Sequence, residues 1–197
     1  MKTRMVVSAA LLLFPVITSA QEATSSEFRP GQWALQFRGI SGLVGFGIMR
    51  FSSPRTAWIM NVDVNARLLN GTATSGGTSS DANDHDVFVQ AGIGKRFYQS
   101  IRSKVRSFQS IGVAGSYQNQ EQSSAFGTTF KTKSWAGGLE GQVGGAYWLT
   151  SNISLGGTAS VGAGYVNQEV TSGGTQIKQH GVSISGVDVA LVLGIYF

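Results

Sequence analysis

Hydrophobic and polar residues alternate along most of the chain after residue 30. Segment 56–69 is the clearest case. Its even positions are Trp58, Met60, Val62, Val64, Ala66 and Leu68, and its odd positions include Asn61, Asp63, Asn65 and Arg67. Successive side chains of a strand point to opposite faces, so this pattern predicts a strand with one apolar and one polar face.

The same alternation recurs in eight segments separated by turn residues. They cover 31–40, 43–51, 56–69, 84–98, 105–118, 130–148, 153–168 and 186–197. Connections after the second, fourth and sixth segments are short, whereas 70–83, 119–129 and 169–178 are expected to form long polar loops. The pattern predicts an all-β fold, an eight-stranded antiparallel up-and-down barrel that spans a membrane with its apolar face outward.

The final segment has the most regular apolar face, formed by Val187, Val189, Leu191, Leu193, Ile195 and Phe197. Its length suits a tilted strand that crosses a bilayer, which requires about 9–11 residues. Val182 and Ile184 fall on the opposite parity. We interpret this change of phase as the strand leaving the hydrocarbon region above Gly186.

The second segment is ambiguous, because Val44, Phe46 and Ile48 alternate with glycines and a methionine. Placing Arg50 toward the interior puts Met49 and Phe51 on the lipid face. We adopt that phase as the prediction.

Composition supports a membrane barrel over a soluble one. Charged residues make up only 13% of the chain, against about 25% in soluble domains, yet the mean hydropathy is only +0.05. A lipocalin-like soluble barrel would place the apolar face inside. Large aromatic residues instead fall on the outward parity near strand ends, as in interfacial girdles: Trp33, Trp58, Trp135, Tyr147 and Tyr165.

The N-terminus predicts export. Lys2 and Arg4 precede an apolar stretch over 5–17, and Thr18, Ser19 and Ala20 supply small residues for cleavage. We expect a signal peptide over 1–20, a periplasmic lead-in over 21–30 and the barrel over 31–197. The formal charge of +5 includes two basic residues of the leader, and the remainder is too small to predict a nucleic-acid partner. The absence of cysteine excludes a disulfide framework.

From about Trp33 to Phe197 the chain resembles the small outer-membrane β-barrel family of the opacity-protein and OmpA-barrel type. The resemblance rests on the leader, the up-and-down pattern and the ending Val189, Leu191, Leu193, Ile195 and Phe197, which is similar to the signal read by the barrel assembly machinery. It implies location in the cell outer membrane, with outer-membrane lipid and that machinery as partners. It leaves any extracellular ligand open.

Charged residues on the inward parity form the main candidate site. They are Arg38, Arg50, Asp63, Arg67, Arg96, Glu140 and Asp188. A barrel of eight strands is just wide enough to be filled by side chains, and buried charges require partners. We therefore expect a structural or surface-interaction barrel with a salt-bridged, plugged lumen. The alternatives are a narrow channel for ions or small solutes and, third, a lipid-modifying enzyme.

Neither a metal site nor a catalytic site is predicted. Asp81, Asp84, His85 and Asp86 cluster in sequence, but their spacing matches neither a calcium loop nor a zinc pattern. His180 and Ser183 are three residues apart, so a regular strand points them to opposite faces. We expect no cofactor and no enzymatic activity.

Overall fold

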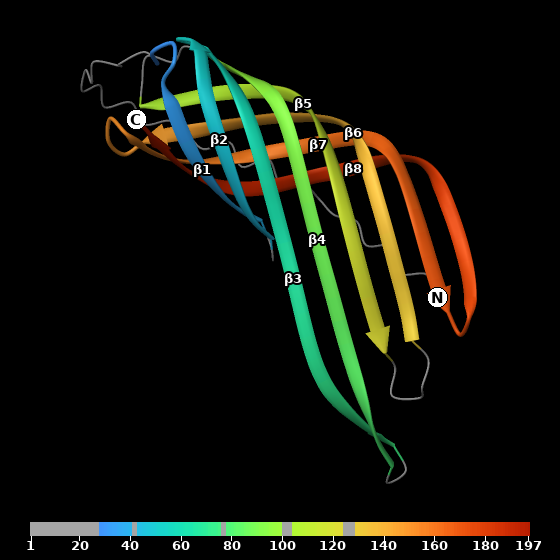
Figure 1. Cartoon of the computed structure of the whole chain (residues 1–197). Helices are drawn as coiled ribbons and strands as arrows, with labels where there is room; N and C mark the ends of the chain where they lie inside the picture. The colour runs from blue at the N-terminus through green and yellow to red at the C-terminus, as the bar shows by residue number, and fades with distance from the viewer. Residues whose placement is uncertain (1–27, 41–42, 76–77, 100–103, 124–128) are drawn as a thin grey trace, which may run out of the picture.

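A computed structural model describes residues 28–40, 43–75, 78–99, 104–123 and 129–197, and shows eight antiparallel strands closed into a barrel (Figure 1). The strands are β1 (Trp33–Ile40), β2 (Leu43–Ser53), β3 (Thr56–Ser75), β4 (Thr78–Tyr98), β5 (Val105–Ser123), β6 (Thr129–Trp148), β7 (Ile153–Ser172) and β8 (Thr175–Tyr196). The prediction of an eight-stranded up-and-down barrel is confirmed. None of the described residues forms a helix of the length and apolarity that a membrane crossing needs. The predicted leader lies outside the described residues.

Each strand pairs with its sequence neighbour, and β1 closes the barrel by pairing with β8. This seam runs from Ala34 opposite Tyr196 to Gly39 opposite Leu191. We call the end of the barrel that carries Phe197 the base, and the opposite end the rim. The β2–β3 and β6–β7 connections lie at the base, as do the last residues of β4 and the first residues of β5.

The strands differ greatly in length. β1 has 8 residues and β2 has 11, whereas β3 to β8 have 19 to 22 each. The predicted loops at 70–83, 119–129 and 169–178 are therefore mostly strand, which corrects the sequence interpretation. Gly173 and Gly174, with φ of 54° and 83°, make the tight β7–β8 turn, a conformation that glycine adopts without a Cβ clash.

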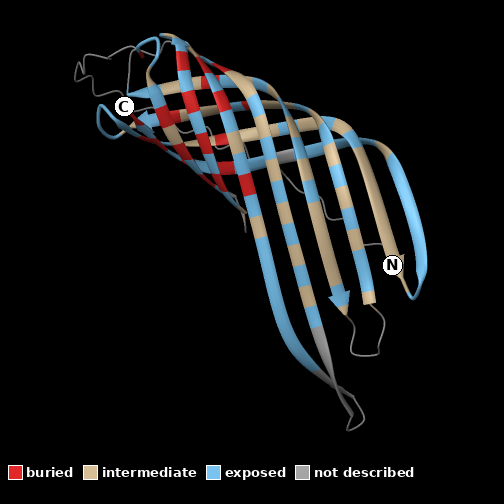
Figure 2. Cartoon of the chain, viewed as in Figure 1, coloured by how far each residue is buried: buried red, intermediate tan, exposed pale blue. Residues whose placement is uncertain are grey.

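The alternation places apolar side chains outside, as predicted. Trp58, Met60, Leu139, Val143 and Leu191 are all exposed on the outer surface of the barrel. Buried residues gather in the base half of the barrel, and the rim half is intermediate or exposed (Figure 2). The core is thus a filled lumen near the base.

The predicted phase of β2 was wrong. Met49 and Phe51 are 0% and 1% exposed and lie in the lumen. Arg50 lies outside, with its guanidinium carbon 5.5 Å from the ring centroid of Trp33. Burying a thioether and an aromatic ring while leaving the guanidinium near the surface avoids the cost of an unpaired buried charge.

The change of phase in β8 has a different cause from the predicted one. Ser160 pairs with Asp188 and Gly162 with Ser185, so two backbone positions of β8, Gly186 and Val187, oppose Val161 alone. This is a β-bulge, which inserts one extra residue into a strand. Val182 and Ile184 consequently remain on the outer surface, at 83% and 81% exposure.

Close approach of β6 and β7 depends on paired glycines. A Cβ on Gly138 would lie 2.3 Å from the carbonyl oxygen of Ala163 and 2.5 Å from the Cα of Gly164. Any larger residue would force these backbones apart.

Candidate functional site

Aromatic side chains close the lumen at its base. Phe28, from the segment before β1, is 5% exposed, and its ring stacks on Phe51 with centroids 4.0 Å apart. Around it lie Tyr98, Trp148 and Tyr196, with ring centroids 4.9, 5.7 and 5.5 Å from that of Phe28. We call Phe28, Phe51, Tyr98, Phe108, Trp148 and Tyr196 the aromatic layer.

Arg106 adds a cation to the aromatic layer. Its guanidinium carbon lies 4.6 Å from the ring centroid of Phe28 and 5.0 Å from that of Trp148. A guanidinium held over aromatic faces is attracted by their quadrupoles. Through Phe28, the N-terminal segment therefore contacts Arg106 of β5 and Trp148 of β6 as well as Phe51 of β2.

A second layer, centred on Arg96, lies next to the aromatic layer. Arg96 is fully buried, and it donates to Gln36 Oε1 at 3.1 Å, Gln142 Oε1 at 3.3 Å and Ser110 Oγ at 3.3 Å. Its guanidinium carbon also lies 4.0 Å from the ring centroid of Phe108. Gln142 Nε2 in turn donates to Glu140 Oε1 at 2.6 Å. Glu140 is thus linked to Arg96 through one amide.

A third layer is the ion pair of Arg38 and Asp63. Nη2 of Arg38 donates to Oδ2 of Asp63, and both side chains are buried. The two residues come from β1 and β3, which lie on either side of β2. A buried pair of this kind costs several kcal/mol when only one partner is removed. The ion pair therefore links β1 to β3 inside the lumen, at a level between the base and the rim.

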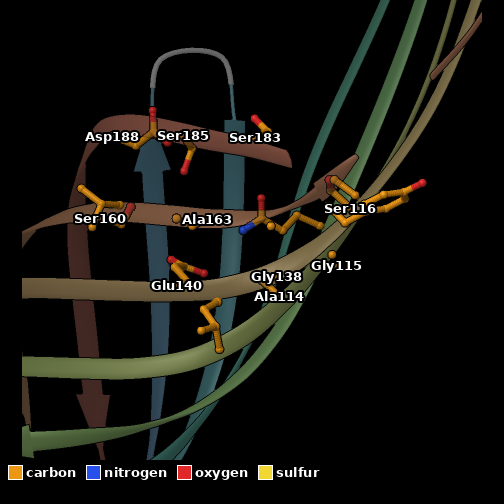
Figure 3. A pocket seen from close by; sticks show the side chains of 18 residues that line it. Ala114, Gly115, Ser116, Gly138, Glu140, Ser160, Ala163, Ser183, Ser185 and Asp188 are labelled. Atoms are coloured by element: carbon orange, nitrogen blue, oxygen red, sulfur yellow. The ribbon is translucent and has the colours of Figure 1, made fainter. Parts of the chain in front are cut away.

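Above the third layer the lumen widens into a cavity of about 190 Å³, which we call the cup. Its wall carries small inward residues of β5 to β7, among them Ala114, Gly138, Ser160 and Gly162. In Figure 3, Glu140 on β6, Ser160 on β7 and Asp188 on β8 lie around this space. Ser183 and Ser185 of β8 also line it.

The structure brings only some of the predicted charge network together. Arg38, Asp63, Arg96 and Glu140 lie in the lumen, whereas Arg50 lies outside it. Arg67 shares the inward parity of Asp63 but is exposed near the rim, opposite Asp86 in the register of β3 and β4. Asp188 faces the cup and is exposed.

The aromatic layer was not foreseen in the sequence. Residues 21–30 have no period, so nothing local distinguishes Phe28 from a solvated aromatic. The only available signal was parity: Phe51, Tyr98, Phe108 and Tyr196 all fall on inward positions at strand ends near the base. The rings of Phe51, Tyr98 and Tyr196 all contact the ring of Phe28.

The residues considered for metal binding and catalysis do not assemble into a site. Asp84 and Asp86 share one face of β4 and His85 lies on the other, while the side chain of Asp81 is outside the described part. Gln118 Nε2 donates to Asp86 Oδ1 at 3.1 Å. Across the described ranges, no three His, Cys, Asp or Glu residues form a group that could hold a metal ion.

His180 and Ser183 lie on opposite faces of β8. The ring of His180 stacks on outward Tyr165 with centroids 6.3 Å apart, and Ser183 lines the cup. A nucleophile and its base must be within hydrogen-bond reach of one another. These two residues therefore do not form such a pair.

The ending Val189, Leu191, Leu193, Ile195 and Phe197 keeps its side chains on the outer surface, where all five are exposed. Phe197 also exchanges backbone hydrogen bonds with Trp33, at 3.2 Å and 3.0 Å. The ending therefore forms part of the seam that closes the barrel.

Comparison with protein-family models finds no match. Comparison with curated protein sequences also finds none. Solved structures do match. A major outer membrane protein from Thermus thermophilus is 14% identical, covers 84% of this chain and 98% of that one, and superposes with a TM-score of 0.55. The outer membrane protein OprG from Pseudomonas aeruginosa is 13% identical, covers 85% and 92%, and gives a TM-score of 0.52.

At these identities the likeness concerns the fold alone. It agrees with the closed eight-stranded topology described above. The chain has the fold of the small eight-stranded outer-membrane β-barrels.

Proposed function

We propose that this protein is an outer-membrane barrel with a closed lumen, whose long hairpins at the rim meet the surroundings of the cell. The observation that carries the proposal is the stack of three closing layers: the aromatic layer, the layer around Arg96, and the ion pair of Arg38 and Asp63. In this arrangement the base faces the periplasm, as expected for such barrels with both termini on that side.

The outward apolar surface supports insertion into a membrane. Trp33, Trp58 and Tyr147 lie near the base on the outer surface, and Trp135 and Tyr165 lie farther along β6 and β7. Rings at two levels fit the two interfaces of a bilayer. Outer-membrane lipid is accordingly the expected surrounding, and the ending on Phe197 is expected to be read by the barrel assembly machinery.

Planar-bilayer recording tests the closed lumen. Purified, folded protein should give no discrete conductance steps at any applied voltage, because the buried side chains of the three layers occupy the lumen. Discrete steps from the wild-type protein would contradict this proposal and favour the narrow channel. In that case Glu140→Ala should alter ion selectivity, since Glu140 lies where the cup meets the closing layers.

An enzymatic role receives no support from the described residues. A lipid-modifying enzyme would change the lipid A profile of cells that express it. We expect that profile to be unchanged when wild-type protein is compared with an empty vector. A new lipid species would overturn the non-enzymatic assignment.

A further inference from the structure

Two basic side chains lie on the outer surface near the base, one strand apart. Arg50 of β2 pairs in register with Trp58 of β3, and Trp58 pairs with Lys95 of β4; Figure 1 shows these three strands side by side. Neighbouring strands are about 4.8 Å apart, so the Cα atoms of Arg50 and Lys95 are about 10 Å apart across Trp58. Both long side chains can therefore reach one ligand placed over Trp58. We call Arg50, Trp58 and Lys95 the basic row.

Both charges of the basic row lie at the base edge of the apolar surface. The guanidinium carbon of Arg50 is 5.5 Å from the ring centroid of Trp33, the first residue of β1. The Nζ atom of Lys95 is 5.8 Å from the ring centroid of Trp58 and 5.7 Å from that of Phe97, which is two residues nearer the base on the same face of β4. The stem of Lys95 is therefore directed toward the base, as in lysines that carry their charge to the head-group region.

Neither charge of the basic row is neutralised by a carboxylate. None of the ion pairs formed by the described residues includes Arg50 or Lys95. Ring faces attract these cations but do not neutralise them. A phosphate group supplies negative charge and accepts the N–H donors of both residue types. The basic row thus favours a phosphate-bearing ligand at the surface of the membrane.

A hollow in the outer surface begins directly beside the basic row, on its rim side. Its volume is about 710 Å³, and its lining is almost entirely apolar. Ile48, Met60 and Ile93 form the part nearest to the charges, each two residues from a member of the basic row on the same strand. Farther toward the rim, the small outward residues Ala91 and Gly115 lie opposite one another in the register of β4 and β5 and leave room between larger side chains.

The part of the hollow next to the basic row lies in the base-side leaflet. Two residues correspond to about 7 Å of strand, and a tilt of about 40° reduces this to roughly 5 Å along the membrane normal. The hydrocarbon of one leaflet is about 15 Å thick, half that of a bilayer. An apolar chain in the hollow therefore starts from a head group at the basic row and points toward the middle of the membrane, as the chains of that leaflet do.

We propose that this surface binds one anionic diacyl phospholipid of the base-side leaflet. Its phosphate lies over Trp58 between the two cations of the basic row, and one acyl chain lies in the hollow along Met60 and Ile93 toward Ala91. This inference rests on the proposed membrane placement but not on the closed lumen. A silent bilayer recording together with no lipid preference would overturn this inference alone.

Native mass spectrometry of the purified protein in detergent tests the site. Dioleoyl phosphatidylglycerol and dioleoyl phosphatidylcholine, which have the same acyl chains, are titrated separately, and the fraction of protein that carries one lipid gives each dissociation constant. We expect one saturable adduct, with an affinity about tenfold higher for phosphatidylglycerol, the combined effect of two ion pairs near solvent. Heat-dependent gel mobility checks that each variant is folded.

The double variant Arg50→Gln/Lys95→Gln should lose most of the preference for phosphatidylglycerol, because both cations are removed. Each single variant should reduce the preference about threefold. Lys133→Gln is the matched control: Lys133 is exposed and has the outward parity of Trp135, but it lies near the rim. Its loss should leave the preference unchanged.

Ala91→Phe tests the hollow without altering any charge. The added ring should lower the affinity for both lipids about threefold, because it displaces the acyl chain from its contacts. Val89→Phe is the matched control, since Val89 faces outward on the same strand but is not part of the lining of the hollow. It should leave both affinities unchanged.

Four results would overturn the proposal. The first is equal affinity of the wild-type protein for the two lipids. The second is an undiminished preference in the folded double variant, or an equal loss of preference in Lys133→Gln protein. The third is wild-type affinity in folded Ala91→Phe protein. The fourth is a series of adducts that grows without saturation, as adsorption of lipid to the detergent micelle would give.

Discussion

The ring of Phe28 stacks on the ring of Phe51 inside the base of the barrel, with centroids 4.0 Å apart and ring planes inclined by 25°. A residue outside the strands is thus part of the core. It joins the N-terminal segment to β2, and its contacts with Tyr98, Trp148 and Tyr196 extend to β4, β6 and β8.

Phe28→Ala should lower the free energy of unfolding by about 3 kcal/mol, because truncating a buried Phe removes its packing and leaves a cavity. Urea titration of protein in lipid vesicles measures the change. Arg29→Ala is the control, since Arg29 is exposed and its loss should change stability by less than about 0.5 kcal/mol. Equal effects of the two substitutions would show that Phe28 does not hold the base together.

The pairing of Arg38 with Asp63 predicts strong non-additivity. Asp63→Leu alone and Arg38→Met alone should each cost about 3 kcal/mol, because each leaves a buried charged group without its partner. The double variant Arg38→Met/Asp63→Leu should recover most of that loss, since both charges are removed. A double-mutant cycle from urea unfolding gives the interaction energy. Additive losses would mean that the two side chains act separately.

Gly138 and Gly137 are adjacent, but substitution by alanine should destabilise the protein only at Gly138. Gly138→Ala places a Cβ within 2.3 Å of the carbonyl oxygen of Ala163, whereas for Gly137→Ala the nearest atom is 3.9 Å away. We expect the first to cost more than about 2 kcal/mol through forced separation of β6 and β7, and the second to be nearly neutral. The fraction that refolds into vesicles, judged by gel mobility without boiling, reports both. Similar yields would contradict the close packing.

The bulge in β8 predicts that one residue can be deleted without inverting the strand. Removing Gly186 leaves a single residue opposite Val161 and keeps Val182 and Ile184 outside. We expect the shortened protein to fold, with a free energy of unfolding within about 1 kcal/mol of the wild type. Deletion of Leu191 serves as the comparison, because it shifts one side of a regularly paired region by one residue and should prevent folding. Loss of folding on removal of Gly186 would show that the bulge itself is required.

The sequence by itself determined the number of strands, their order and the faces of most of them. Segment 56–69 shows why: its apolar and polar positions differ so strongly that only one phase buries the polar set. In β2 the same reasoning failed, because Phe46 and Ile48 on one parity and Met49 on the other give either face an apolar character. Tertiary packing decided the phase by burying Met49 and Phe51 in the lumen.

Tertiary structure also decided every feature that depends on residues far apart in the chain. Inward parity placed Arg38 and Asp63 in the lumen, but only the registers of β1, β2 and β3 made them partners. The polar composition of 70–83, 119–129 and 169–178 indicated loops, yet backbone pairing between neighbouring strands continues through most of these residues. Phe28 is part of the core because aromatic side chains of β2, β4, β6 and β8 surround its ring. The short hairpin β1–β2 lies between the two long strands β3 and β8, a relation that no local pattern contains.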